Sequence, residues 1–260
     1  MFFPCIIIME YGLEGIDMDE RQKKFTENTD DSTWCSLYRA AGVAALLAAL
    51  VFRRNLAAEI SLISPVQIPE HAADWFNLLH ANPFLGLAYL NVFDLVEYFL
   101  VGVLFLALYV LLSQTNRSWS LMALWMSVLA VGLNFASNQA FSMLALSLQY
   151  VNSSASQAAS LAMSGESLLA VGSHGTAAYA GLMFISLAGL VFSILMLQSH
   201  YFGRFTGIIG IIANAIMLSV FLILPLVPQW IVFPYVLSAP LRVTWYILIG
   251  IKLLKTSKHH

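Results

Sequence analysis

The sequence predicts an all-α, polytopic membrane protein with six transmembrane helices and with both termini in the cytoplasm. Hydrophobic residues make up 60% of the 260 residues and charged residues only 10%, whereas soluble domains carry roughly a quarter charged residues. The apolar residues form runs of about 20 residues, the length at which a helix crosses the hydrocarbon. These runs lack the two-residue alternation of transmembrane barrel strands. Basic residues occur in every second connection, as in multi-pass proteins.

Six apolar runs are the candidate spans, taken in chain order. The first begins near Leu37 and ends in the fifties or as late as Ile63. The second lies within Pro83–Leu112, where Asn82 and Pro83 are a suitable cap and first turn. A minimal second span that ends at Leu112 would begin at Phe93. The other four runs are Leu121–Ala145, Thr176–Leu197, Phe205–Val227 and Trp230–Leu254.

The distribution of Lys and Arg predicts the orientation. The connections 67–82, 146–175 and 228–229 contain neither residue type. The basic residues that precede, separate or follow the runs on the opposite side are Arg21, Lys23, Lys24, Arg39, Arg117, Arg204, Lys252, Lys255 and Lys258. Since cytoplasmic loops are enriched in Lys and Arg, this alternation predicts six spans with cytoplasmic termini in the cell membrane. Five or seven spans would break the alternation.

Two outer connections are predicted to contain short helices. In residues 67–82, apolar side chains at i, i+3, i+4 and i+7 form one stripe, which suits a helix lying in the membrane interface. The stripe consists of Ala72, Trp75, Phe76 and Leu79. A second surface helix is expected over about 155–170, and Gly172 and Gly175 then lead into the fourth span.

Small residues four positions apart predict close contacts between the spans. The pairs are Ala177/Gly181, Gly189/Ser193 and Gly203/Gly207. Their spacing is typical of helix packing, and no further role is assigned to them.

The domain organisation follows from these runs. Residues 34–256 are predicted to form the transmembrane domain. Residues 1–33 are expected to be a disordered cytoplasmic tail, because residues 9–33 are acidic and polar. Residues 257–260 form a second short cytoplasmic tail. Met9 and Met18 are alternative start residues, so the sequence leaves open whether residues 1–17 belong to the natural protein.

Ionisable residues inside or at the rim of the apolar runs are the most informative feature. They are Arg53, Arg54, Glu59, Asp94, Glu97 and Arg242. A charge near the centre of a membrane helix costs about 2.5–3.5 kcal/mol, while each Leu returns only about 0.3–0.6 kcal/mol. We therefore expect Asp94 or Glu97 to pair with one of the three arginines; the sequence leaves the partner open.

Amide and aromatic residues extend this polar set. Asn91, Asp94 and Tyr98 would share one face of the second span, and Asn134 and Asn138 would lie one turn apart on the third, on a face that includes Ser142. Trp245 and Tyr246, close to Arg242 in sequence, would stack on it, line the pocket or simply pack nearby. The predicted ligand-binding residues are Arg53, Arg54, Glu59, Asn91, Asp94, Glu97, Asn134, Asn138, Arg242 and Trp245.

The depth of these residues predicts a one-sided pocket. Counted along the predicted spans, they gather in the outer half of the bundle, while the inner half is nearly pure hydrocarbon apart from Asn214. A pore or proton relay needs polar groups along the whole path, so neither is favoured. The sequence predicts a polar pocket open toward the external side, with an apolar plug beneath it.

The favoured function is binding, and in one version transport, of a small polar or amphiphilic ligand. The arginines would contact its anionic groups, and the carboxylates and amides would orient them. Two alternatives stay open: an intramembrane enzyme acting on outer-leaflet lipid, and a structural or interaction subunit of a membrane complex. Membrane lipids and other membrane subunits are the expected partners, and the net charge of −2 argues against nucleic acid.

No catalytic residue, cofactor or metal is assigned, and binding is favoured over catalysis. Cys5 and Cys35 offer no disulfide framework and no metal spacing. Four outer residues could meet as a zinc site, namely His71, Asp74, His80 and His174. Their spacing is unspecific, and solvated loop residues are the favoured interpretation.

Several stretches carry a family resemblance. They are LYRAAGVAALLAALVFRRNLAAEISL, NPFLGLAYLNVFDLVEYFLVG, NFASNQAFSM and SAPLRVTWYILIGIKLL. They resemble bacterial six-helix membrane proteins grouped as the domain-of-unknown-function 4386 family, over about residues 36–256. The resemblance implies a helical bundle. It implies no activity and no catalytic residues.

Overall fold

The computed structural model describes residues 34–52, 69–227, 230 and 232–257. Within these ranges every regular element is a helix. The predicted tail 1–33 and the candidate site residues Arg53, Arg54 and Glu59 lie outside the described residues. The first helix is Trp34–Phe52. The others are α2 (Ala72–Ala81), α3 (Pro83–Tyr89), α4 (Val92–Leu112), α5 (Arg117–Ser137), α6 (Ala140–Tyr150), α7 (Ala155–His174), α8 (Thr176–Gln198), α9 (Arg204–Leu218), α10 (Val220–Leu226) and α11 (Val232–Thr256).

The protein is an all-α, polytopic membrane protein, as predicted. Among the described residues, five helical stretches are long and apolar enough to cross a membrane: Trp34–Phe52, Val92–Leu112, and stretches within Arg117–Tyr150, Ala155–Gln198 and Phe233–Thr256. Helix α9 is apolar but shorter, with 15 residues, and α10 follows it. The sixth span and the orientation therefore stay predictions.

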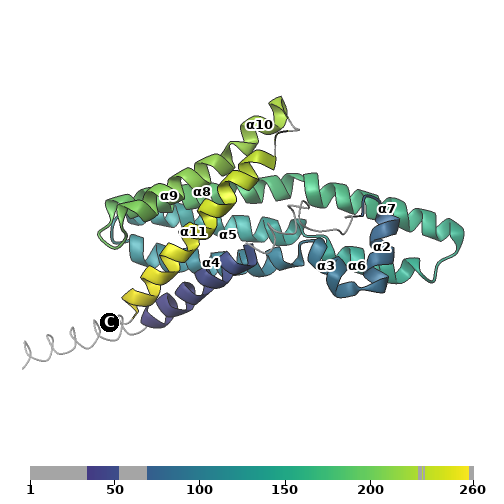
Figure 1. Ribbon diagram of the computed structural model, residues 1–260, viewed down its shortest axis with the longest axis horizontal. Coiled ribbons are helices and arrows are strands. Elements are labelled where there is room, and N and C mark those ends of the chain that lie inside the picture. The colour runs from purple at the N-terminus through teal and green to yellow at the C-terminus, as the bar shows by residue number, and fades with distance from the viewer. Residues whose placement is uncertain (1–33, 53–68, 228–229, 231, 258–260) are drawn as a thin grey trace, which may run out of the picture.

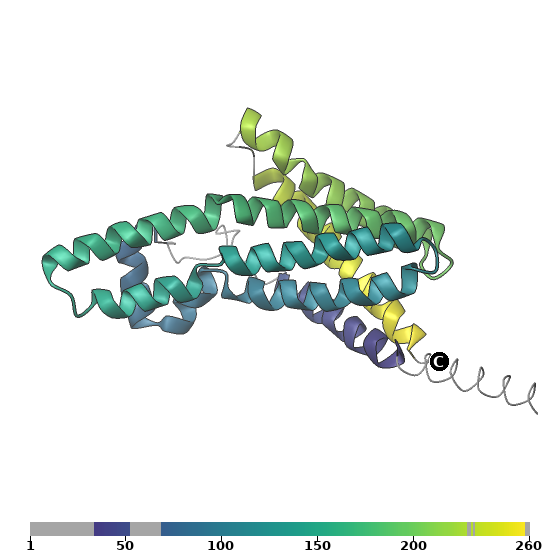
Figure 2. The same cartoon turned by 180° about the vertical axis from the view of Figure 1, so that it is seen from behind.

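Apart from the short α10, the helices form two parts, which we call the bundle and the extension (Figures 1 and 2). The bundle consists of the first helix, α4, α5, α8, α9 and α11; α5 packs on α8, α8 on α9, and α9 on α11. The extension consists of α2, α3, α6 and α7 and lies beyond one end of the bundle. The stretches Arg117–Tyr150 and Ala155–Gln198 have 34 and 44 residues, or roughly 50 and 65 Å of helix. A bilayer core is about 30 Å thick, so each stretch is longer than one crossing requires.

Two of the predicted spans differ from the observed helices because polar side chains interrupt them. The predicted span Leu121–Ala145 lies within the stretch Arg117–Tyr150, but this stretch consists of two helices, α5 and α6. Helix α5 begins earlier, where the side-chain oxygen of Asn116 accepts a hydrogen bond from the Trp119 N–H (3.2 Å). It ends at Ser137, because the Asn138 side chain bonds to nearby backbone in place of the helix ladder. The predicted span Phe205–Val227 is divided into α9 and α10 at Ser219, whose hydroxyl donates to the Ile216 carbonyl (2.6 Å).

The second and sixth spans are close to their predicted positions. Helix α4 begins at Val92, one residue before the predicted minimal start, and ends at Leu112. The segment before it is a separate helix, α3, with Pro83 in its first turn and with Asn82 accepting a hydrogen bond from the Leu85 N–H (3.1 Å). Helix α11 matches the sixth span and continues through Pro240.

The short helix α2 buries the predicted apolar stripe, but against protein. Its Trp75, Phe76 and Leu79 pack on Met143 of α6 and on neighbouring residues of α7. The rings of Phe76 and Tyr150 are 5.1 Å apart. The stripe therefore faces the α6–α7 pair, which covers it. The second surface helix predicted for about 155–170 is part of α7.

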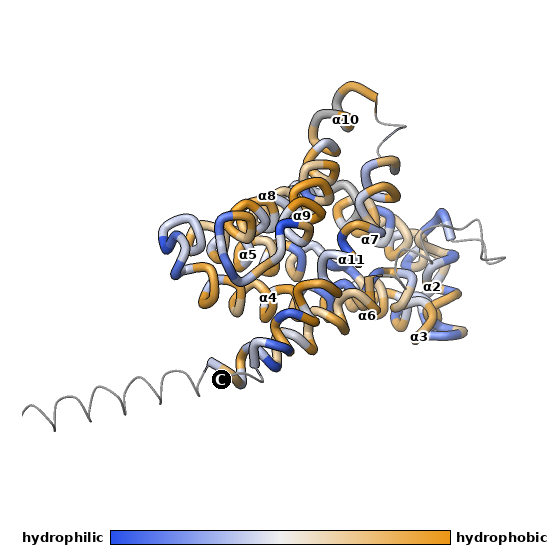
Figure 3. The backbone as a smooth tube through the Cα atoms, turned by 60° about the vertical axis from the view of Figure 1, so that its left-hand side comes forward, coloured by the Kyte–Doolittle hydropathy of each residue, from blue (hydrophilic) through white to orange (hydrophobic). Residues whose placement is uncertain are grey.

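Small residues set the close contacts within the bundle. A Cβ on Gly250 would lie 2.9 Å from the carbonyl oxygen of Gly42 on the first helix, and one on Gly189 would lie 2.5 Å from the Asn214 side chain. The predicted contacts of Gly181, Gly189 and Gly207 are confirmed, whereas Gly203 has nothing within 4 Å of a Cβ position. Figure 3 shows hydrophobic residues along most of the length of these helices.

Candidate functional site

The polar residues at the start of α4 owe their position to a helix break. Asn91, between α3 and α4, adopts the left-handed conformation (φ 59°, ψ 34°), which Asn tolerates better than most residues with a Cβ. The Asp94 N–H donates to the Asn91 carbonyl (3.0 Å), so a new helix begins at Val92. Asp94 and Glu97 are therefore held in the first two turns of a membrane helix, where the helix dipole favours negative charge.

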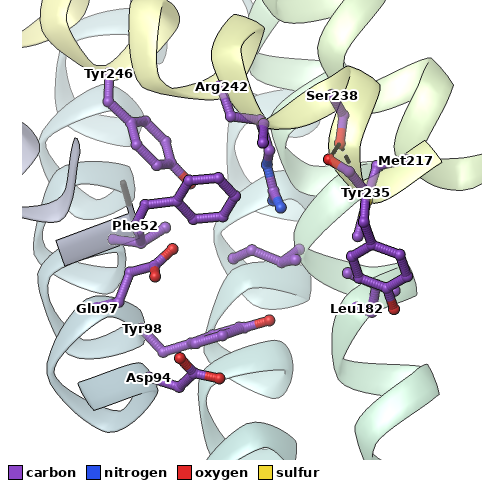
Figure 4. A pocket seen from close by; sticks show the side chains of 13 residues that line it. Phe52, Asp94, Glu97, Tyr98, Leu182, Met217, Tyr235, Ser238, Arg242 and Tyr246 are labelled. Carbon is purple, nitrogen blue, oxygen red and sulfur yellow. Dashed lines mark hydrogen bonds between the residues drawn. The ribbon is translucent and has the colours of Figure 1, made fainter. Parts of the chain in front are cut away.

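These carboxylates face a cavity of about 110 Å³ inside the bundle. Figure 4 shows Asp94, Glu97 and Tyr98 reaching it from α4, and Ser238 and Arg242 reaching it from α11. Its apolar wall includes Leu182 and Ile185 of α8, Met217 of α9 and Phe52 of the first helix. Since a water molecule occupies about 30 Å³ in the liquid, the cavity has room for a few waters or for one small polar group.

Arg242 is the cationic member of this cavity and is buried, with 6% of its surface exposed. Its guanidinium carbon lies 5.7 Å from the centre of the Phe52 ring, a geometry that favours a cation over an aromatic face. Among the described residues its Nε–H has no hydrogen-bond partner. A buried donor without a partner is costly, so a group inside the cavity would stabilise this arrangement.

The helix that carries Arg242 presents further polar groups to the same cavity. Ser238 lies one turn before Arg242, and its hydroxyl is 3.2 Å from the Tyr235 carbonyl and 3.4 Å from the Met217 sulfur. Pro240 stands between them inside α11 and has no N–H to donate to the carbonyl of Val236, the residue four positions earlier. The stretch of α11 that lines the cavity therefore combines polar side chains with a missing backbone hydrogen bond.

A second cavity, of about 420 Å³, adjoins the first toward the extension. Asp94, Tyr98, Leu182 and Tyr235 line both cavities. The other polar residues of the second cavity are Glu70, Asn91, Asn134, Ser137, Asn138 and Gln139. Its volume falls within the usual range for small-molecule sites, roughly 300–1,000 Å³.

Helix breaks surround the second cavity. The Asn138 side chain joins two of them, because its Nδ2 donates to the Asn91 carbonyl (2.9 Å) and its Oδ1 accepts from the Ala140 N–H (3.1 Å). The third break, at Gly175 between α7 and α8, lies three residues after Gly172, which packs on Gln139. Interrupted membrane helices expose backbone polar groups, and such breaks commonly surround binding sites.

An apolar layer lies on the other side of Arg242. It contains Leu104, Phe105 and Leu108 of α4, Phe192 of α8 and Ile249 of α11, all buried. The Phe105 ring lies 5.2 Å from that of Phe192. Among the described residues this layer contains no charged side chain, so the two cavities end at it.

The comparison with protein families identifies the chain. Residues 39–255 match the family described as Domain of unknown function (DUF4386). The chain belongs to the DUF4386 family. No curated protein and no solved structure matches it. In this DUF4386 member, the residues that line the two cavities are therefore the only guide to a function.

The structure brings most of the described candidate residues together, in two groups. Asp94, Glu97 and Arg242 line the first cavity, and the amides Asn91, Asn134 and Asn138 line the second, with Asp94 between them. The prediction that Asn134 and Asn138 share a helix with Ser142 is wrong. Asn138 ends α5 with extended backbone (φ −74°, ψ 120°), so it reaches Asn91 instead, and Ser142 lies on α6.

Trp245, one of the predicted ligand-binding residues, lines neither cavity and packs inside the bundle. It is fully buried, with its ring 6.1 Å from Phe105 and its indole nitrogen against Gly210 of α9. Tyr246, the next residue, lines the first cavity instead. Successive side chains of a helix are rotated by about 100° about its axis. Trp245 therefore points away from the cavity and toward α9.

Sequence reasoning missed Tyr235 and Ser238. Both lie on the face of α11 that carries Arg242, seven and four residues before it. Tyr246, four residues after Arg242, lies on the same helix face, whereas Trp245 lies at the edge of that face. Helical periodicity around the buried arginine was therefore the signal that could have found them.

His71, Asp74 and His80 form no metal-binding cluster among the described residues. His71 Nδ1 lies 3.5 Å from a Glu166 carboxylate oxygen. No group of three or more His, Cys, Asp or Glu side chains that could hold a metal ion is found among the described residues.

Proposed function

We propose that this DUF4386 member binds a small polar or amphiphilic ligand with an anionic group in the two adjoining cavities. The observation that carries the proposal is Arg242, a buried arginine whose Nε–H has no partner among the described residues and which faces a cavity. Guanidinium groups bind carboxylates and phosphates through charge-assisted hydrogen bonds. An anionic group next to Arg242 would satisfy the donor and offset the cost of its burial.

The lining suggests how such a ligand would be oriented. Its anionic group would lie in the small cavity near Arg242, with the hydroxyls of Tyr235 and Ser238 nearby. Its polar remainder would extend into the larger cavity toward Asn134 and Asn138. Apolar parts would contact Leu182, which lines both cavities. Asp94 and Glu97 line the same small cavity and oppose anionic charge there, so the ligand should carry no more than one acidic group, directed at Arg242.

Orientation is part of the proposal. We place the extension outside the cell membrane, with six spans and cytoplasmic termini, on the strength of the Lys and Arg distribution. Cysteine labelling tests it in a chain whose native cysteines are replaced by serine. An impermeant maleimide should label Ser160→Cys on α7 of intact cells and should not label Ser118→Cys at the start of α5. The reverse pattern would overturn the orientation.

Mass spectrometry of co-purified small molecules tests the binding. The full chain is purified in a mild neutral detergent, and molecules released on denaturation are identified. We expect an anionic compound in the wild-type sample, reduced about tenfold or more in Arg242→Gln, because one charge-assisted bond is worth about 1.5–3 kcal/mol. Arg204→Gln, an exposed arginine outside both cavities, should retain the compound at the wild-type level.

A second variant guards against a folding defect in Arg242→Gln. Tyr235→Phe keeps every charge and removes one hydroxyl at the junction of the two cavities, and we expect it to lower retention about threefold. The same molecules in the same amounts from wild type, Arg242→Gln and Tyr235→Phe would contradict the proposal.

The other functions considered from the sequence remain hypotheses. Transport would require the apolar layer at Phe105 and Phe192 to open, and uptake of the identified compound into vesicles would test it. Turnover of outer-leaflet lipid by the purified chain, or its tight co-purification with a larger complex, would favour the enzyme or the subunit instead.

A further inference from the structure

A third cavity lies at the opposite end of the bundle from the proposed ligand site. It has a volume of about 490 Å³ and forms where the first helix, the α4–α5 turn, the α8–α9 connection and the end of α11 meet. Aromatic residues from separate elements line it: Trp34 and Tyr38 from the first helix, Tyr109 from α4 and Tyr201 from the α8–α9 connection. Arg117, the first residue of α5, is its cation.

Most of the described basic residues gather at this end of the bundle, and the described acidic residues lie toward the other end. Apart from Arg242, the described Lys and Arg residues all lie toward it: Arg39, Arg117, Arg204, Lys252 and Lys255. The described acidic residues all lie in the extension or at the end of the bundle next to it: Glu70, Asp74, Asp94, Glu97 and Glu166. No carboxylate is among the described residues that line the third cavity. Its electrostatic potential therefore favours an anion.

Two side chains of the cavity lining, Gln114 and Arg117, offer hydrogen-bond donors. The Tyr201 hydroxyl donates to the Gln114 Oε1, which leaves the two N–H groups of the Gln114 amide as donors. The hydroxyls of Ser113 and Thr256 donate to carbonyls of their own helices. Arg117 contributes a guanidinium with five N–H donors. The donors of Arg117 and Gln114 suit phosphate oxygens.

The position of the cavity favours a lipid as the source of the phosphate. It lies where α4 ends and α5 begins, the depth of lipid headgroups for helices that span the hydrocarbon. Trp34 and Trp119 at this level are 38% and 51% exposed, and aromatic residues of this kind are enriched at membrane interfaces. Val110 and Leu111 add apolar surface to the lining, which suits the glycerol and the start of an acyl chain.

We propose that this cavity binds the headgroup phosphate of an anionic phospholipid, with Arg117 as the principal contact and with Gln114, held by Tyr201, as a second donor. Basic pockets between helix ends on the cytoplasmic side are a general means of recognising anionic lipids. The site is independent of the ligand cavities near Arg242, and its test does not depend on that function.

Native mass spectrometry of the full chain in neutral detergent tests the site, with residues 1–33 kept in every variant. Phosphatidylglycerol, phosphatidylcholine and inorganic phosphate are titrated separately. We expect wild type to bind phosphatidylglycerol more tightly than phosphatidylcholine, and Arg117→Gln to weaken phosphatidylglycerol binding about tenfold. Arg204→Gln removes the same charge at the same end, outside the cavity lining, and should change binding less than about twofold. Tyr201→Phe should weaken binding about threefold.

Three results would overturn the proposal. Equal affinity for the two lipids would mean that no anionic headgroup is recognised. Equal losses in Arg117→Gln and Arg204→Gln would mean diffuse attraction to a basic surface. Displacement of phosphatidylglycerol by inorganic phosphate at similar concentrations would assign the cavity to a soluble anion. Arg117 is exposed, so its replacement should leave the thermal unfolding midpoint nearly unchanged, and this is measured in parallel.

Discussion

The two halves of the bundle are built from the same helices but are held together differently. In the half next to the extension, helices are interrupted, and side chains such as Asn138 bond to backbone exposed at the breaks. In the other half, helices are regular and approach closely through small residues such as Gly42 and Gly250. Lipid gives helices little hydrophobic reason to associate. Stability is therefore expected to come mainly from the packed half, and ligand selectivity from the interrupted half.

The largest effect is expected from a large residue at the tightest contact of the packed half. A Cβ at Gly210 of α9 would lie 2.2 Å from the Ser193 hydroxyl and 2.4 Å from the Trp245 indole nitrogen. These neighbours are buried and have little space to move. Gly210→Leu should therefore separate α8, α9 and α11, at a cost of about 3 kcal/mol or more. Size-exclusion profiles and thermal unfolding in detergent measure the loss of folded protein.

The same substitution at Gly132 of α5 is the matched control. Nothing lies within 4 Å of a Cβ position there, so Gly132→Leu should fold normally. A Gly210→Leu chain that unfolds at the wild-type temperature would show that close packing does not hold this half together.

A smaller effect is expected from the residue that links two helix breaks in the other half. Asn138→Ala removes the hydrogen bonds to the Asn91 carbonyl and from the Ala140 N–H, which measure 2.9 and 3.1 Å. Each such bond contributes about 0.5–1.5 kcal/mol, so we expect a loss of about 1–2 kcal/mol. Hydrogen exchange should speed up at the starts of α4 and α6, because both breaks lose their connection.

The packed half should not respond to this change. Amides of α8 and α9 around Ser193 and Gly210 should exchange at wild-type rates in Asn138→Ala. Asn152→Ala, in the exposed turn between α6 and α7, removes an equivalent side chain and should leave exchange at α4 unchanged. Faster exchange throughout the bundle would mean that its two halves unfold as one unit.

The packed half was also the more predictable from sequence. Long apolar runs mark the membrane helices, and the four-residue spacing of Gly189 and Ser193 indicates a contact surface, because both signals depend on residues close together in the chain. The break at Asn138 carries no such signal. Asn is compatible with a helix interior, and its partner Asn91 is 47 residues away, so only the three-dimensional arrangement decides that the helix ends there.

The charged residues of the candidate site could be predicted from the sequence, but the aromatic residues beside them could not. The cost of burying charge in lipid indicates that Asp94, Glu97 and Arg242 belong together, and the structure places all three at one cavity. Composition could not predict that Tyr246 and not Trp245 lines the cavity, because both are large aromatic residues close to the arginine in sequence. The rotation of α11 against α9 decides which one faces the cavity, and in this arrangement Trp245 packs against Gly210 of α9.

The smallest effect is expected within the extension, where one carboxylate of α7 accepts a hydrogen bond from the first turn of α2. The Ala72 N–H donates to Glu166 Oε1 of α7 (2.8 Å), and the N-cap residue His71 makes no side-chain cap of its own. A carboxylate at a helix N-terminus satisfies a free N–H and interacts favourably with the helix dipole. Glu166→Ala should therefore lower the local stability of α2 by about 1 kcal/mol, seen as roughly fivefold faster hydrogen exchange in residues 71–81.

Two further variants separate the hydrogen bond from the charge. Glu166→Gln keeps an acceptor and loses the charge, so exchange should be intermediate. His71→Ala removes the other partner of Glu166, an exposed pair with an N–O distance of 3.5 Å, and surface pairs of this kind contribute little; it should leave exchange within twofold of wild type. If His71→Ala loosened α2 as much as Glu166→Ala, the ion pair and not the helix start would be what joins α2 to α7. The contact would then weaken at high salt, whereas a hydrogen bond at a helix N-terminus should be affected less.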